Sequence, residues 1–187
     1  LASQVDGLVA VTADAEPLHP AIIWLDRRAA NQTREIRRAM DDEQVRRITG
    51  LNTDASHVAP KILWLRETHP EVYDRAAGLL LPGSALVAWL TGERVVDHAN
   101  ASSTLLYDVS ARGWSASMLE ITALDEHRLG TIRAAGDIVG PLIRDLGVVL
   151  MWTGDIDNVI MSQVGKAGGP MGGRDLHIGD LDKGVLP

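Results

Sequence analysis

Two short polar segments near the start of the chain carry side chains that could bind a polyhydroxylated ligand. Residues 4–7 (Gln-Val-Asp-Gly) precede one apolar run, and residues 26–28 (Asp-Arg-Arg) follow another. Amide, carboxylate and guanidinium groups exchange hydrogen bonds with hydroxyls, so they suit a sugar or a polyol. Each segment also has a simpler interpretation. The Asp-Gly pair is a common turn sequence, and Asp26 with its arginines favours a surface ion pair at a helix start.

A third polar segment, residues 97–104, is dense in small hydrogen-bonding side chains, and Asn100 is one of them. It could contact the same kind of ligand. From the residues alone, a loop with capping residues before a short helix is the favoured interpretation, because Asp, Asn, Ser and Thr are preferred at such positions.

A carboxylate that could act as a base follows the apolar residues 148–152. Asp155 stands at the end of this expected strand, where burial can tune a catalytic acid or base. A simple strand-end turn explains the segment equally well. A metal-binding module using Asp155, Asp157 and Asp180 is disfavoured, because the glycine and glutamate of the calcium loop are missing from their places. No histidine pair has i, i+4 spacing, so no metal site is predicted.

Amino-acid composition and net charge argue against several classes of function. The chain has 187 residues, 45% hydrophobic and 23% charged, which is ordinary for a globular protein. Its net charge of −7 argues against nucleic-acid binding and against adhesion to anionic lipid. It has no cysteine, no apolar run of the roughly 20 residues that span a membrane, and no signal-like start. We therefore expect a cytoplasmic protein.

The apolar pattern predicts a mixed α/β organisation. Residues 8–11 and 21–24 read as two strands of a hairpin around a turn at 14–17. Helices are expected over the ranges that follow, and a further strand near 148–151. The expected helices are 29–40, 42–48 ending at Gly50, 61–67 with Pro60 in the first turn, a short one from Pro70, 83–90 ending at Gly92, and 114–124. A glycine-rich stretch at 165–173 changes the character of the chain, and we place a domain boundary near Gly140.

Taken in order, these segments resemble the FGGY carbohydrate kinases, which include xylulose, ribulose, erythritol and glycerol kinases. No single stretch identifies the family, and the resemblance rests on the shared order and spacing of the stretches over residues 2–141. The matching stretches are Gln4–Leu8, Pro20–Ala29, Ala59–Leu65, Leu80–Gly83 continuing to Trp89–Gly92, Asp97–Val109, Trp114 with Met118 and Leu119, and Gly136–Gly140.

The resemblance implies a partial actin-like (ribonuclease H-like) α/β fold, a mixed sheet with helices. Residues 1–140 would form the sugar-binding domain, and 141–187 the start of the ATP-binding domain. The family phosphorylates a sugar or polyol hydroxyl with ATP and Mg²⁺, and Thr153-Gly154-Asp155 resembles the segment that holds its catalytic base. Many members have Met-His where this chain has Val5-Asp6, and members with Asp at the second position occur among polyol and less-studied sugar kinases. By the family resemblance the expected substrate is a pentulose or a polyol. The predicted substrate-binding residues are Gln4, Val5, Asp6, Asp26 and Asn100, and the predicted catalytic residue is Asp155.

The sequence also departs from the family pattern. No Asp-x-Gly-Thr phosphate turn precedes Leu1, and Gly179-Asp180-Leu181-Asp182 stands where Gly-Thr-Ser is expected. Acidic side chains there would repel phosphate. We therefore expect a kinase fragment that is inactive alone and binds ATP and Mg²⁺ poorly. The alternative is a non-catalytic module that binds sugar or self-associates into a homo-oligomer through apolar faces left uncovered.

Overall fold

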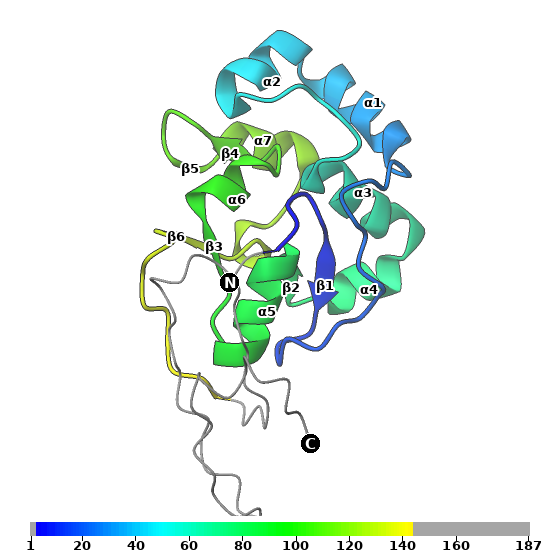
Figure 1. Cartoon of the computed structure of the whole chain (residues 1–187). Helices are drawn as coiled ribbons and strands as arrows, with labels where there is room; N and C mark the ends of the chain where they lie inside the picture. The colour runs from blue at the N-terminus through cyan, green and yellow to red at the C-terminus, as the bar shows by residue number, and fades with distance from the viewer. Residues whose placement is uncertain (1–2, 144–187) are drawn as a thin grey trace, which may run out of the picture. The chain divides into compact units, whose positions relative to one another are not determined.

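Helices and short strands alternate along residues 3–143, the part of the chain that this computed structural model describes (Figure 1). The helices are α1 (Ala30–Ala39), α2 (Asp42–Thr49), α3 (Val58–Thr68), α4 (Pro70–Arg75), α5 (Pro82–Thr91), α6 (His98–Ser102), α7 (Ala116–Thr122) and the 3₁₀ turn η1 (Glu126–Arg128). The strands are β1 (Val9–Val11), β2 (Gly78–Leu80), β3 (Val95–Asp97), β4 (Tyr107–Asp108), β5 (Gly113–Trp114) and β6 (Thr131–Arg133).

The strands form three two-stranded sheets. β1 pairs antiparallel with β2, in a register that sets Ala10 opposite Leu79. β3 runs parallel to β6, and β4 forms a hairpin with β5. Helix α3 packs against α1 and α4, while α5 packs against β1 and β2 (Figure 1). The described part is thus a mixed α/β structure, as the sequence predicts.

Local sequence explains where several helices begin and end. The Asp41 side chain accepts a hydrogen bond from the Gln44 amide at 2.8 Å and so caps α2. Helix α2 is followed by Gly50, whose φ of 74° lies in the left-handed region that favours a residue without a Cβ. Helix α5 starts at Pro82, where the missing N–H is not needed. The helices expected at 42–48 and 83–90 are confirmed, each one or two residues longer.

The expected hairpin between residues 8–11 and 21–24 is wrong. The first strand forms as β1, but its partner is β2, 69 residues further on and buried along its whole length. The returning segment meets the first only at isolated bridges, Leu8 to Ile22 and Val11 to Pro17. The prolines at 17 and 20 have no N–H to continue a ladder, so this segment is a poor strand. The turn between the two segments is present, since the Thr12 amide donates to the Glu16 carbonyl at 2.9 Å.

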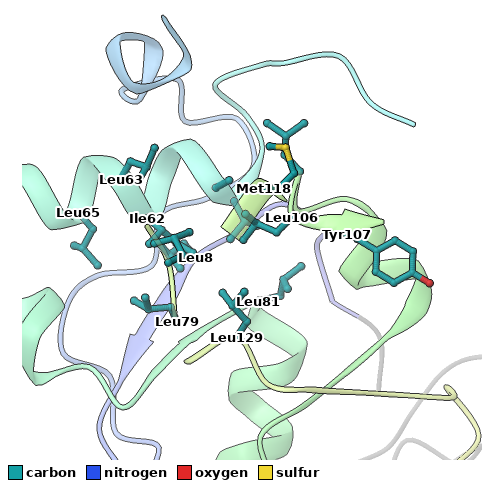
Figure 2. Packing of buried hydrophobic residues seen from close by; sticks show 14 of the residues in the cluster. Leu8, Ile62, Leu63, Leu65, Leu79, Leu81, Leu106, Tyr107, Met118 and Leu129 are labelled. Carbon is teal, nitrogen blue, oxygen red and sulfur yellow. The ribbon is translucent and has the colours of Figure 1, made fainter. Parts of the chain in front are cut away.

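One apolar core joins α3 to the strands and to α7 (Figure 2). Ile62 and Leu65 of α3 are almost fully buried, as are Leu79 of β2 and Met118 of α7. Leu8, next to the N-terminal segment that carries Gln4 and Asp6, belongs to the same cluster. The core therefore anchors the end of the segment in which the sequence predicts ligand contacts.

The described residues all fall within one unit of the chain, Leu1–Arg144. The domain boundary expected near Gly140, and the second domain expected over 141–187, stay predictions. The strand expected at 148–151 lies outside the described residues. Within residues 3–143, no helix is long and apolar enough to cross a membrane.

Gly7 supplies a test of this packing. A Cβ added at Gly7 would lie 2.6 Å from Pro82 Cγ, whereas one added at Gly136 would meet nothing within 4 Å. We expect Gly7→Ala to lower the free energy of unfolding by roughly 1–3 kcal/mol, the usual cost of overpacking. Gly136→Ala should leave it nearly unchanged. Urea unfolding of both variants checks this, and equal midpoints would show that Pro82 does not constrain the residue at position 7.

Candidate functional site

The N-terminal loop (residues 4–7) lies against the segment that precedes Asp26. Leu8 and Ile22 exchange two backbone hydrogen bonds, of 2.8 and 2.9 Å. Beyond this bridge the Trp24 amide donates to Gln4 Oε1 at 3.4 Å. Gln4, Val5 and Trp24 are exposed, with half of the Trp24 surface open to solvent. The fold therefore brings together two of the polar segments singled out from the sequence.

Asp6 has an unusual backbone and an unpaired side-chain atom. Its φ of 57° lies in the left-handed region, which few residues other than glycine adopt. Its Oδ1 lies 3.5 Å from Nδ1 of His57, the residue that precedes α3. Both atoms are buried, and within the described part of the chain neither makes a hydrogen bond. A 3.5 Å separation is longer than a normal hydrogen bond, so the two atoms are neighbours that are not hydrogen-bonded to each other.

Lys61 lies beneath the N-terminal loop with no exposed surface. Its Nζ donates to the backbone carbonyls of Asp6 and Ser56. Burial lowers the pKa of Lys61 to about 8, while the negative charges of Asp6, Asp26 and Asp54 act to raise it. At neutral pH the group is therefore an ammonium, and it is the common counter-charge of three carboxylates from three segments.

Asp26 is held by the arginine two residues later. The Arg28 amide donates to Asp26 Oδ1 at 2.9 Å, and Arg28 Nε donates to Oδ2 at 2.8 Å. The Arg28 hydrogen bonds lower the pKa of Asp26 against the effect of its burial. The same guanidinium lies over the Trp64 ring, 4.7 Å from its centroid. The ion pair expected at the helix start is confirmed, and it fixes the Asp26 carboxylate beside the loop.

Arg27 makes a separate ion pair that shapes the approach to α3. Its guanidinium lies 2.6 Å from Asp54 Oδ2. Burial acts to raise the pKa of Asp54, but hydrogen bonds from Arg27 and Ser56 hold it well below its usual range. The other oxygen of Asp54 accepts from the Ser56 amide at 2.9 Å, so the carboxylate orders the turn that leads into α3.

The backbone amide and side chain of Asn100 are hydrogen-bonded to Asp97 and not to the N-terminal loop. Its amide N–H donates to Asp97 Oδ1 at 2.9 Å and its side chain to Oδ2 at 2.6 Å. Asp97 thereby caps α6, which is the role that the residues alone favour. Helix α6 reaches α3 indirectly, since the Ala59 amide donates to the Thr104 carbonyl at 3.0 Å. A substrate contact by Asn100 stays a prediction.

Other expected features have mixed outcomes. Asp155, Asp157 and Asp180 lie outside the described residues. Within residues 3–143 no three carboxylate or imidazole groups come together as a metal site would require. A cavity of about 530 Å³ lies between Arg94, Trp114 and His127, and none of the predicted substrate-binding residues lines it. The predicted site is instead an open surface around the N-terminal loop.

Comparison with known proteins identifies the family. The model of the FGGY family of carbohydrate kinases, N-terminal domain, matches residues 1–161. The chain belongs to the FGGY family of carbohydrate kinases. The glycerol kinase of Thermococcus gammatolerans is 32% identical over 171 residues, 89% of this chain and 34% of that protein. The xylulose kinase of Lactococcus lactis is 32% identical over 73% of this chain and 27% of that protein.

A solved structure supports the same assignment. The crystal structure of a xylulose kinase from Brucella ovis superposes with a TM-score of 0.68 at 31% identity, over 74% of this chain and 29% of that one. The α/β fold class is thus confirmed, as part of a sugar kinase. This FGGY chain spans about a third of the length of the curated relatives it matches. The comparisons support a kinase and do not favour the alternative of a self-associating module.

The sequence analysis does not predict the central group of this candidate site. Lys61 was noticed only as part of a matching stretch, and His57 and Asp54 were not singled out. One signal was available, because a single lysine interrupts the apolar run from Val58 to Leu65 on a helix that must be buried. A charged residue at such a position needs partners, and those partners mark a site.

The buried ammonium predicts how stability depends on pH. The pKa of Lys61 is about 8 in the folded chain and near 10.5 when unfolded, so between these values the unfolded state binds more protons. The free energy of unfolding of the native chain, minus that of Lys61→Met, should rise by roughly 1–3 kcal/mol as pH increases from 8 to 10.5. Urea unfolding at stepped pH measures this difference. A flat or falling difference would contradict the assignment.

Proposed function

We propose that this chain binds a sugar or polyol at the N-terminal loop and forms the sugar side of an ATP-dependent kinase. The observation that supports this most is the Asp6 turn, which the buried Lys61 ammonium holds beside exposed Gln4 and Trp24. Fixed carboxylates next to an exposed aromatic ring suit a ligand that has both hydroxyls and C–H faces.

Each side chain has a definite task in this proposal. Asp6 and Asp26 accept hydrogen bonds from substrate hydroxyls, and both are ordered before the ligand arrives. Asp26 is fixed by Arg28, and the Asp6 backbone by Lys61. Gln4 offers its amide N–H groups, because its Oε1 already accepts from Trp24. Preordered acceptors reduce the entropy lost on binding and orient the hydroxyl that reacts.

ATP and Mg²⁺ belong to the complete kinase in this proposal. The residues described here do not fit a magnesium site, since no cluster of three candidate ligands occurs among residues 3–143. No step through the metal is therefore derived from them. Asp155 is proposed as the base that takes the proton from the attacking hydroxyl, on the family resemblance of Thr153-Gly154-Asp155 alone.

The substrate class is proposed as a pentulose or a polyol. The relatives named above are a glycerol kinase and xylulose kinases, so their names cover both classes. Asp6 supplies an anionic acceptor in place of the Met-His pattern of many members. A carboxylate accepts only, which favours a ligand that presents free hydroxyls as donors.

Calorimetric titration tests sugar binding directly. We expect one member of a panel of ketopentoses and polyols to bind the 187-residue chain, and Asp6→Asn to weaken that binding by about tenfold or more, because it removes a charged acceptor. Asp74→Asn on the exposed side of α4 is the matched control and should bind as the native chain does. If no ligand of the panel gives a heat of binding at millimolar concentration, the proposed function is contradicted.

A second experiment concerns catalysis. The chain spans about a third of its relatives, so we expect no sugar-dependent release of ADP from ATP by this chain alone. A coupled ADP assay with the sugar found by titration provides the measurement, with Asp155→Ala as the comparison. Turnover that disappears in Asp155→Ala would overturn this expectation and place the base within the chain.

A further inference from the structure

Lys61 is buried in an arrangement that links three separate segments. Its Nζ donates to the Asp6 carbonyl in the N-terminal loop and to the Ser56 carbonyl in the turn before α3. Its charge also acts on Asp26, in the segment that precedes α1. A lysine stem alone would fill this space as an apolar side chain, but only its ammonium can donate to both carbonyls.

The Asp6 backbone needs such support. A non-glycine residue with φ near +57° is strained, and such conformations persist only when the surroundings hold them. On the following side, Gly7 lies too close to Pro82 for any side chain, so the loop has little room to shift there. The bond from Lys61 to the Asp6 carbonyl acts at the strained residue itself. Without it, the loop is free to relax and turn the Asp6 carboxylate away.

We propose that Lys61 is a positioning residue of the sugar site, whose ammonium holds the Asp6 turn in its left-handed conformation by donating to the Asp6 and Ser56 carbonyls. This inference rests on the proposed function for the identity of the ligand. The positioning itself concerns the free chain and is measured without any ligand.

The chain contains no cysteine, which allows a clean removal and restoration of the ammonium. In Lys61→Cys the amine is lost, and alkylation of the single thiol with bromoethylamine in denaturant, followed by refolding, rebuilds a lysine-like side chain with sulfur in place of one methylene. The native chain carried through the same treatment is the matched control. Leu65→Ala, also buried in α3, controls for general loss of stability.

Amide hydrogen exchange reads out the loop. We expect Lys61→Cys to speed exchange in residues 3–8 by roughly tenfold more than in α1, and aminoethylation to restore the native rate. Leu65→Ala should speed both regions alike. Unchanged exchange in residues 3–8, an equal rise in α1, or no recovery on aminoethylation would each overturn the proposal.

Sugar affinity separates the two proposals. For the ligand found by titration, Lys61→Cys should bind about tenfold more weakly or worse, and the aminoethylated chain should recover most of the affinity. Native affinity in Lys61→Cys would overturn the positioning role. If the native chain binds no sugar, the proposed function fails, while the exchange measurement still decides the role of Lys61.

A measurement without any change at position 61 covers the case in which Lys61→Cys does not refold. Lysine occurs only at 61, 166 and 183, so Lys166→Arg/Lys183→Arg leaves Lys61 as the only lysine. With ¹⁵N-labelled lysine, its ammonium protons should exchange with water far more slowly than those of free lysine, because they are buried and hydrogen-bonded. Exchange as fast as in free lysine would overturn the proposal.

Discussion

A buried ammonium must be surrounded by acceptors, and the organisation of this site follows from that requirement. Lys61 has no exposed surface, so leaving its charge unpaired would cost far more than one hydrogen bond. The chain meets the demand with two backbone carbonyls, from Asp6 in the loop at 4–7 and Ser56 in the turn before α3, while the charges of Asp6, Asp26 and Asp54 favour the ammonium. The loop and the turn are therefore joined through one cation, although they are far apart in the sequence.

Helix α3 connects the apolar core to the Lys61 ammonium. Ile62 and Leu65 are buried against β2 and α7, while Lys61 on the same helix points to the N-terminal loop. The turn before α3 is ordered by Asp54, whose carboxylate binds both the Ser56 amide and Arg27. Lys61 therefore lies on a helix that cannot shift without disrupting the core. The N-terminal loop, which is hydrogen-bonded to Lys61, is held in place through the same packing.

The sequence predicted local elements well and long-range pairing poorly. Helices α2 and α5 follow from capping residues and apolar spacing, which act within a few positions. The pairing of β1 with β2 was missed because no local signal joins residues 69 positions apart, such as Ala10 and Leu79, whereas a nearby apolar segment gave a false hairpin partner. The same limit applies to the site. Asp6 and Asp26 were singled out, but Lys61 becomes central only when three distant segments meet.

The difference between buried and exposed side chains explains why the family of this chain is easier to infer from its sequence than its substrate. Lys61 and Gly7 are held by the surrounding packing, so a change at either position is expected to disturb the fold. Val5 is about half exposed (48%), and so is Trp24 (50%), so their side chains can change with little effect on the core. We therefore expect substrate differences within the family to arise at exposed side chains of this kind rather than at the buried ones.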